Sequence, residues 1–446
     1  MKFRKKPLIQ AICVLLPSIT TAAEFEVTQC NDDGTGLVAN TLSWSILQAN
    51  TTPGNDTIVL STDVLVSGVM KRLIDSDVTI TSDQTRRTID GNNLNRPLFI
   101  KSGTVTISNV KISNGRAKGG ESGGAGMGGG IFIYDGNVNI QNVSITNSLA
   151  YGGNGFVSGG GGGMFGNGSL SAGGGLFTAA NGSTGGYGGY GLYSDVNTTF
   201  GRGGSPGQHG GFGGGGSDAY SSPRNGGFGG AGGYCYCYES GFGGSGGFGA
   251  SGGDSLYSPG SSGYGASFQG GAGMGGAIFI RTGNLDLSGV NFINNEARGI
   301  TSSSPTIDDA KGLGGALFVL HTLSNLPSSN QGMPDSLPNV TACSITFSTN
   351  SASHDTQTSN NNNNYFDLAN RINQGAVTPG ILACDANDTN FSHTIFSTHS
   401  TSDKTQASNT NNSDRVNRTN SKVITSGPIV CIADDIIFSD GFDENF

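Results

Sequence analysis

The chain has 446 residues, of which 78 are glycine and only 12% are charged. Its 23 Lys and Arg residues stand against 32 Asp and Glu residues, which gives a net charge of −9 at pH 7. This acidic balance argues against nucleic acid and anionic membrane surfaces as partners.

Residues 1–23 have the pattern of a secretory signal peptide. Four Lys and Arg residues lie in the first six positions, the apolar run Ala11–Leu16 follows, and Ala22 and Ala23 supply small residues for cleavage. The apolar run is too short to span a bilayer. Loss of this leader leaves 19 basic against 32 acidic residues, a charge of −13. Because no later segment has 18 uninterrupted apolar residues, we expect no transmembrane segment.

Six cysteines remain after the leader, and an even number in an exported chain favours disulfides. They are Cys30, Cys235, Cys237, Cys343, Cys384 and Cys431. Cys235 and Cys237 alternate with tyrosines, so a strand would present both thiols on one side, as a metal or redox pair requires. No histidine lies near enough to complete a zinc pattern. We therefore interpret the cysteines as candidate disulfides, and the sequence does not select among their pairings.

Residues 24–62 read as a helix followed by a first strand. Leu42, Ile46 and Leu47 have helical spacing, the Pro53-Gly54 pair ends the segment, and Thr57–Val59 begins a strand. Trp44 is interpreted as a buried residue of this segment, with a binding platform as the alternative.

The remaining apolar residues alternate with polar ones in several short segments. Val138 and Ile140 alternate with asparagines, and after the polar pair Gln141-Asn142 the alternation resumes at Val143 and Ile145. The pattern predicts two strands per unit, with a corner between them that keeps the apolar row inward. Similar segments lie at 64–69, 78–82, 86–90, 97–114, 284–293 and 339–348.

A longer unit that contains this alternation is repeated along the chain. The unit at 273–295 recurs in similar form at 126–147, and 312–320 repeats its first half. One such unit cannot bury its apolar row alone, so neighbouring units must stack. We expect the units on either side of the intervening segment to stack directly on each other.

These repeats resemble those of right-handed parallel β-helix proteins of bacterial surfaces, the pectin-lyase-like polymorphic outer-membrane and adhesin-like group. The matching residues are Gly128–Phe132, Gly275–Phe279 and Gly314–Phe318, with the tails 144–150 and 291–297. The resemblance implies that residues 24–62 form an N-terminal cap over the first coil. It implies β-helix coils at 63–151 and 273–350, and little about activity.

Residues 152–272 form a long glycine-rich insertion between the coils. Glycine loses the most backbone entropy on ordering and buries no side chain, so this composition favours mostly irregular structure. The alternative is a bundle of extended glycine strands that approach one another closely. We expect its aromatic residues to be exposed, and therefore name candidate contact residues. They are Tyr187, Tyr190, Phe212, Phe228, Tyr234, Tyr236, Tyr238, Phe242 and Phe248.

Residues 351–446 shift to Asn, Ser and Thr, which predicts a surface loop or linker at 351–364 and final coils or a tail beyond it. The terminal segment 434–446 resembles an ending found on some exported bacterial proteins.

The pattern of residues favours a scaffold over an enzyme. Glycosidases and lyases need clustered carboxylates, and the candidates Asp286, Asp308 and Asp309 have no His-Gly or Arg-x-Lys partner nearby in sequence. His321 is interpreted as a strand-end residue. We expect an all-β protein, a right-handed parallel β-helix solenoid with an N-terminal cap and a glycine-rich insertion, secreted or on the outer surface of a bacterial cell. Its expected role is structural or adhesive, with a surface glycan or protein as partner and no cofactor, metal or catalytic residue assigned. A polysaccharide lyase or glycoside hydrolase on the same fold is the alternative.

Overall fold

The computed structural model describes residues 22–155, 160–181, 200–206, 208–218, 223–235, 243–252, 270–300, 309–324, 332–353, 362–367 and 372. The expected leader lies outside these ranges apart from its last two residues. Residues 373–446, with the expected final coils or tail, also lie outside them.

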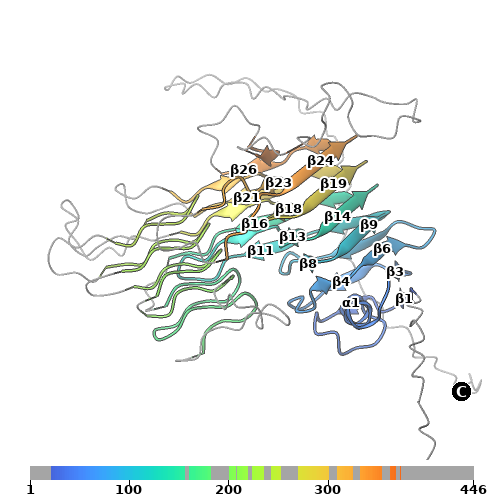
Figure 1. The fold of residues 1–446 in the computed structure, drawn as a ribbon, viewed down its shortest axis with the longest axis horizontal. Coiled ribbons are helices and arrows are strands. Elements are labelled where there is room, and N and C mark those ends of the chain that lie inside the picture. Colours follow the sequence, from blue (N-terminus) through green and yellow to red (C-terminus); the bar gives the residue numbers. More distant parts are fainter. Residues whose placement is uncertain are drawn as a thin grey trace, which may run out of the picture.

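Stacked parallel strands make up the five sheets of this all-β structure (Figure 1). Sheet A contains, in spatial order, β1 (Glu24–Val27), β3 (Asp56–Leu60), β6 (Val78–Ser82), β9 (Thr104–Ser108), β14 (Asn137–Gln141), β19 (Asn284–Ser288) and β24 (Asn339–Cys343). Sheet B contains β2 (Asn31–Asp32), β4 (Val64–Val66), β7 (Arg87–Asp90), β10 (Val110–Ser113), β15 (Ser144–Thr146), β20 (Asn291–Ile293) and β25 (Thr346–Ser348).

The other three sheets are shorter. Sheet C contains β5 (Ile74–Asp75), β8 (Leu98–Ser102), β13 (Ile131–Ile133), β18 (Ile278–Ile280), β23 (Leu317–Val319) and β27 (Tyr365–Phe366). Sheet D contains β11 (Arg116–Lys118), β16 (Leu149–Tyr151), β21 (Glu296–Arg298) and β26 (Ser351–Ala352). Sheet E contains β12 (Gly126–Met127), β17 (Gly273–Met274) and β22 (Gly312–Leu313).

The chain visits the sheets in a fixed order and returns to each one strand further along. From β9 in sheet A it passes through β10 in B, β11 in D, β12 in E and β13 in C before it enters β14 in A. Each strand is parallel to the preceding strand of the same sheet. This path is consistent with a β-helix-like solenoid, and we call one circuit a rung.

Corners of left-handed backbone join sheet A to sheet B. Asn109, Asn142 and Ser344 have φ of 54°, 51° and 51°, and Gly289 has φ of 64° at the equivalent corner. Asparagine is one of the few residues with a side chain that tolerates this conformation. The corner predicted at Gln141-Asn142 is thereby confirmed.

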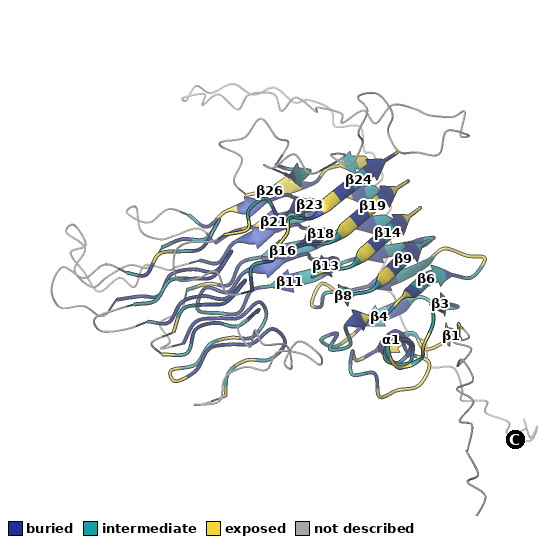
Figure 2. Cartoon of the chain, in the orientation of Figure 1, coloured by how far each residue is buried: buried dark blue, intermediate teal, exposed yellow. Residues whose placement is uncertain are grey.

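The inward row of the strands forms the first hydrophobic core. Ile140 and Leu287, predicted to point inward, are 0% and 2% exposed, and the alternation of buried and exposed residues runs along every strand of sheet A (Figure 2). Burial of such side chains contributes about 1.5–3 kcal/mol each, before the entropy of ordering is subtracted.

Helix α1 (Leu42–Thr51) lies at the first-rung end of the stack, where the sequence predicts a helix. The hydroxyl of Thr41 accepts a hydrogen bond from the backbone N–H of Trp44 and caps the helix. Leu42, Ile46 and Ala49 belong to the first core, and α1 contacts β1, β3 and β5. Trp44 is only partly buried, with its ring edge-on to Phe25 at 6.2 Å.

The insertion does not interrupt the stacking of the rungs. Gly126 and Met127 pair with Gly273 and Met274, and Asn137–Gln141 pairs residue by residue with Asn284–Ser288. Direct stacking of the two flanking units is therefore confirmed.

The described residues of the insertion pack as side-by-side glycine segments, drawn in green at the left of Figure 1. We call these residues, together with the loop 119–125, the glycine lobe. The N–H of Gly161 donates to Gly204, that of Gly203 to Gly174, and that of Gly174 to Gly161, all at 2.9 Å. Three segments thus bond in a cycle, as in a bundle rather than a flat sheet. In its described part the insertion takes the alternative form, and the preference for irregular structure was wrong there.

Absence of side chains is what permits this packing. A Cβ built on Gly227 would lie 1.7 Å from the carbonyl oxygen of Gly211, and one on Gly203 would lie 1.9 Å from that of Gly161. No side chain fits at such distances. The satisfied backbone groups and the close contact of the chains offset the entropy that glycine loses on ordering.

A second hydrophobic core joins the glycine lobe to the outer face of sheet C. Strand β13 is buried at all three positions, because Ile131 and Ile133 face the first core while Phe132 faces the lobe. Phe99, Phe132, Phe279, Phe318 and Phe366 form an outward ladder with ring centroids 4.7–5.1 Å apart. Opposite it, Phe200, Phe212, Phe228 and Phe248 form a second ladder with spacings of 5.2–5.3 Å.

Tight turns place the rings of the second ladder. Each of its four phenylalanines is followed by a glycine with φ between 69° and 79°. A ring thus projects from each turn onto the ladder of sheet C, edge to face in the pairs Phe132–Phe200, Phe212–Phe279 and Phe228–Phe318. Aromatic pairs of this kind contribute about 0.5–1.5 kcal/mol beyond their buried area.

The asparagine run at the end of the described chain was predicted to be a surface loop or linker. Asn362 is instead 2% exposed and accepts a hydrogen bond from the N–H of Gly314 at 2.8 Å. It leads into β27, which pairs with β23. The prediction is wrong for Asn362, which is buried because its side-chain amide satisfies the backbone of the rung before it, whereas 363 and 364 are partly exposed turn residues.

Replacement of Ile140 by Asp tests the first core. We expect a loss of more than about 4 kcal/mol of unfolding free energy, because an unpaired carboxylate would be buried there. Gln141→Asp is the matched control, because Gln141 is an exposed residue of the same strand and its cross-strand neighbours Ser108 and Ser288 carry no charge; it should change stability by no more than about 0.5 kcal/mol. Thermal unfolding followed by far-UV circular dichroism measures both, and equal stability of the two variants would contradict the inward assignment.

Replacement of Gly227 by Ala tests the backbone packing of the lobe. We expect destabilisation by about 1–3 kcal/mol, because the added methyl group overlaps the carbonyl of Gly211. Gly252→Ala is the control, because among the described residues, its chain neighbours aside, the nearest atom to an added Cβ is the carbonyl oxygen of Gly244 at 3.7 Å. Amide exchange of the lobe measures the effect. Faster exchange in both variants, or in neither, would rule out close backbone packing as its cause.

Candidate functional site

The aromatic residues of the insertion do not form the exposed contact surface expected from the sequence. Phe212 and Phe228 are 0% exposed and Tyr234 is 7% exposed, while Phe248 is partly buried against the second core. They were predicted to be exposed because glycine cannot cover them, yet the outward phenylalanines of sheet C do so. Tyr187, Tyr190, Tyr236, Tyr238 and Phe242 lie outside the described residues.

Three of the six candidate disulfide cysteines lie in described segments. Cys235 is fully buried in the glycine lobe, Cys343 is 8% exposed at the end of β24, and Cys30 precedes β2. Cys237, Cys384 and Cys431 lie outside the described residues, so the pairing stays a prediction.

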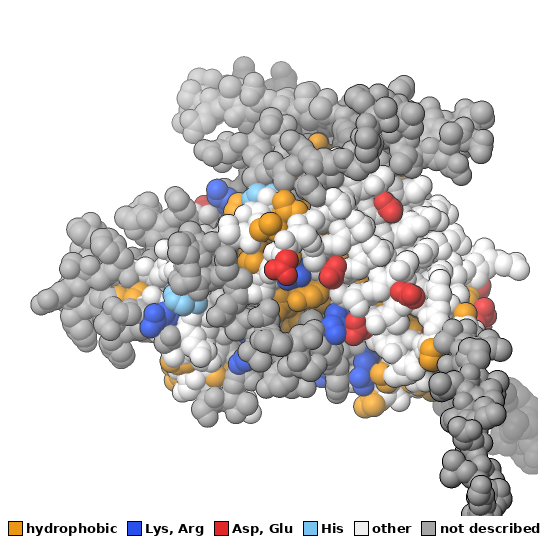
Figure 3. All heavy atoms as spheres, in the orientation of Figure 1, with side chains coloured by type: hydrophobic (Ala, Val, Ile, Leu, Met, Phe, Trp, Pro, Cys, Tyr) orange, Lys and Arg blue, Asp and Glu red, His pale blue; other side chains and the backbone are white. Residues whose placement is uncertain are grey.

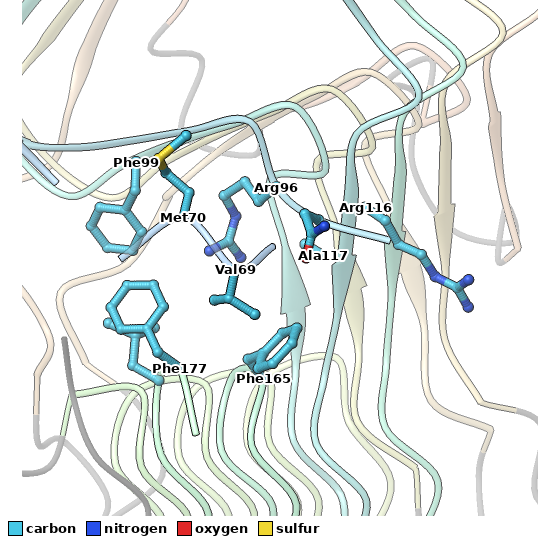
Figure 4. A pocket seen from close by; sticks show the side chains of 10 residues that line it. Val69, Met70, Arg96, Phe99, Arg116, Ala117, Phe165 and Phe177 are labelled. Carbon is cyan, nitrogen blue, oxygen red and sulfur yellow. The ribbon is translucent and has the colours of Figure 1, made fainter. Parts of the chain in front are cut away.

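A small cleft lies between the rungs and the glycine lobe, beside the guanidinium of Arg96 (Figure 4). Its internal space of about 20 Å³ holds about one water molecule, which is too little for a sugar ring. Arg96 donates from Nε to Gly128 and from Nη2 to Met127, at 2.8 and 2.7 Å, and lies over the ring of Phe132. Loss of hydration lowers the pKa of Arg96 to about 9. The side chain ties the turn after β12 to the second core, and this is a structural role.

His321 follows β23, as the strand-end interpretation predicts. Its ring lies 4.5 Å from that of Phe248 and 5.6 Å from that of Phe366. Burial lowers the pKa of His321, and the carboxyl of Asp367 partly opposes this effect. Nδ1 has no hydrogen-bond partner among the residues that the structure describes. This environment keeps the imidazole neutral and holds it within the second core.

Acidic side chains are dispersed over the rungs. Within the described ranges, no group of three or more His, Cys, Asp or Glu side chains is placed to hold a metal ion. Asp286 points outward from β19 between Asn139 and Thr341, which are its neighbours in the adjacent strands. Asp309 is partly buried and lies three residues before β22 of sheet E, and Asp308 lies outside the described residues.

The outer face of sheet A is the extended polar surface that the strands build. Because the register is unbroken, outward residues align in columns that cross the strands. The central column contains Glu24, Thr57, Thr79, Thr106, Asn139, Asp286 and Thr341. Successive members are separated by one strand spacing, about 4.8 Å. We call the outward face of sheet A the polar face.

Two further columns flank the central one, and their side chains bond to one another. In one, the amide of Asn284 donates to Asn137 at 2.7 Å and that of Asn339 donates to Asn284 at 3.1 Å. In the other, the hydroxyl of Ser108 donates to that of Thr81 at 3.1 Å. These bonds fix the edges of the polar face.

The members of the central column from Thr57 to Thr341 behave differently. Their side chains make no hydrogen bond to any residue that the structure describes. Threonine has one strongly restricted χ1 torsion, so its hydroxyl is held in position without such a bond. The central column therefore presents fixed polar groups with unused hydrogen-bonding capacity.

Charge and aromatic rings are scarce on the polar face. Its three columns contain no Lys, Arg or aromatic residue among the described strands, and their acids are Glu24, Glu26 and Asp286. Figure 3 shows the surface over these strands mostly in white, the colour of uncharged polar side chains and backbone. The surface is suited to neutral polar partners.

Reasoning from the sequence assigned the outward residues only to solvent and so missed the polar face. The available signal was their kind rather than their polarity. Thr79 and Thr81, Thr104 and Thr106, and Asn137 and Asn139 repeat an uncharged side chain two residues apart, where Lys or Glu would serve solubility equally well.

The pKa shift of His321 predicts a pH dependence of stability. Because the folded-state pKa is below the ordinary value of 6.5, the unfolded chain takes up the proton first as pH falls. Stability should therefore fall from about pH 7 to pH 5, and His321→Gln should lose less over this range. His209, whose pKa burial also lowers, is common to both proteins. Chemical denaturation at each pH measures the slopes, and identical slopes would contradict the neutral, buried imidazole.

Comparison of the chain with protein-family models, with curated proteins and with solved structures gave no match. Among the described residues, no helix is long and apolar enough to cross a membrane. Function is therefore argued from the chain's own residues, and the polar face is its candidate functional site.

Proposed function

We propose that the chain is a secreted or cell-surface scaffold with a structural or adhesive role, which binds glycans or partner surfaces through the polar face. The fold proposed for it is a right-handed parallel β-helix of the pectin-lyase-like kind, with α1 as its N-terminal cap. The order in which the chain visits sheets A, B, D, E and C, always in parallel, supports this fold. The leader at 1–23 supports export.

One observation carries the adhesive role: a seven-stranded face whose outward columns are almost free of charge. A surface that serves only solubility commonly carries mixed charges. A row of threonine and asparagine side chains offers donors and acceptors together, without the cost of stripping water from ions. Many weak contacts along such a face add to useful affinity when the partner is extended.

Binding is favoured over catalysis because of where the acids lie. A glycoside hydrolase needs two carboxyl groups across one sugar bond, about 5–10 Å apart in a groove. In the described strands of the polar face, Asp286 on β19 is five strands away from β1, the nearest strand with an acid in the same column. The cleft beside Arg96 has room for about one water.

Charge placed on the polar face tests the proposed function. Asn137→Lys/Asn284→Lys introduces two cations on β14 and β19, and should reduce adhesion of the protein to glycan-coated or cell surfaces by at least about tenfold. The matched control, Ser144→Lys/Asn291→Lys, adds the same charge to the same two rungs on sheet B. The first double variant also removes two surface hydrogen bonds, and the control removes one.

Surface plasmon resonance on immobilised glycan arrays, with thermal unfolding as a check of folding, measures the result. Equal adhesion of both variants would exclude the polar face as the contact surface. Release of reducing or unsaturated sugar by the wild type would favour the enzymatic alternative.

A further inference from the structure

The central column of the polar face has a periodicity that restricts the shape of its partner. Each rung contributes one side chain, and the spacing of about 4.8 Å persists because every strand pair from β3 to β24 keeps its register. A partner that meets every side chain must be extended and must repeat at a similar distance. Sugar residues in an extended glycan chain do so.

Hydrogen-bonding capacity restricts the chemistry of the partner. Thr57, Thr79 and Thr106 each have a hydroxyl that can donate and accept, and the amide of Asn139 does both. None of the four bonds to another described residue through its side chain. Sugar hydroxyls, which also donate and accept, match such groups without any requirement for charge.

Rigidity makes this matching effective. The threonines are restricted at χ1. Their strands carry Ile58, Ile80 and Ile107 on the inner face, and all three are 0% exposed in the first core. The flanking asparagine column is bonded along its length. Little further entropy is lost when a partner binds, and this favours binding through many small contacts.

The charge of the face distinguishes between glycan classes. Glu24, Glu26 and Asp286 are its charged groups in the described strands, and no basic residue balances them within the columns. Uronate polymers and sulfated glycans would be repelled. A neutral chain that lies across the strands is not repelled, and it contacts the uncharged members of the column from Thr57 to Asn139.

We infer that the central column binds a neutral, linear polysaccharide, laid along the stacking direction with about one sugar residue per rung. This inference rests on the proposed function and specifies its ligand class and binding mode. Affinity then depends on chain length, because each added residue gains one more rung until the column ends.

Calorimetric titration of the full chain with dimers to hexamers of β-1,4-glucan, β-1,4-xylan and β-1,4-mannan tests the inference, with oligogalacturonate as the anionic comparison. We expect one neutral series to bind, with affinity that rises steeply from dimer to hexamer, and no binding of oligogalacturonate. Thr79→Val/Thr106→Val removes two hydroxyls and keeps the shape and the β-branching. It should weaken the hexamer at least tenfold.

The matched control is Thr88→Val/Thr346→Val, two outward threonines of sheet B. It should leave hexamer binding unchanged, and thermal unfolding should show both variants folded. Adhesion that persists in Thr79→Val/Thr106→Val and fails in Asn137→Lys/Asn284→Lys would overturn the inference while the proposed function stands. The inference would also be overturned if oligogalacturonate bound as tightly as the neutral chains, or if affinity did not depend on chain length. If no variant loses adhesion, the proposed function itself is excluded.

Discussion

The structure depends on the contact between two ladders of phenylalanine. Sheet C must bury both of its faces, because each of its central strands carries an outward phenylalanine between two inward aliphatic residues. An uncovered ladder would leave a continuous apolar stripe in water across five rungs. The glycine lobe covers it with the rings of Phe200, Phe212, Phe228 and Phe248, and the rungs in turn give the lobe a large apolar partner. The phenylalanines of the glycine lobe are therefore explained by the ladder that they cover, and the outward phenylalanines of sheet C are explained by the lobe.

Two kinds of close packing therefore coexist in the chain. In the rungs, aliphatic side chains fill the space between sheets about 10 Å apart. In the lobe, peptide groups lie against peptide groups, and even one methyl group has no room at positions such as Gly203. The phenylalanine ladders are where these two packings meet. Arg96, which is partly buried, and Arg281, which is buried, lie at this boundary; each donates to a backbone carbonyl and lies over an aromatic ring.

Sequence patterns predicted the rungs well and the lobe poorly, for physical reasons. The alternation around Ile140 and Ile145 has a period of two, and burial requires that period, so strand positions and the corner at Asn142 could be inferred. The helix at Leu42–Thr51 followed from spacing in the same way. Glycine has no such period, because it has no side chain to face one way or the other. The informative signal was the run Ile-Phe-Ile at 131–133 and 278–280, apolar at three successive positions, which indicates a strand buried on both faces. The polar face could not be inferred in the same way, because polar residues are expected at the solvent-facing positions of any half-buried strand.

Direct pairing of the flanking rungs has a consequence for how the chain folds. The N–H of Ser148 bonds to Asn295, 147 positions further along, and many such contacts unite β13–β16 with β18–β21. Each doubling of such a loop adds only about 0.6 kcal/mol to the entropy of closing it, so the cost in stability is modest. The cost in rate is larger, because folding slows as contacts become more distant in sequence. The rungs before the insertion keep an open strand edge at β14 until the whole insertion has been synthesised and the next unit pairs with that edge. Such an edge can recruit another copy of the same strand. A chain of this design is most vulnerable to misassembly during its own folding, when the rungs before the insertion have formed and the lobe has not yet covered them.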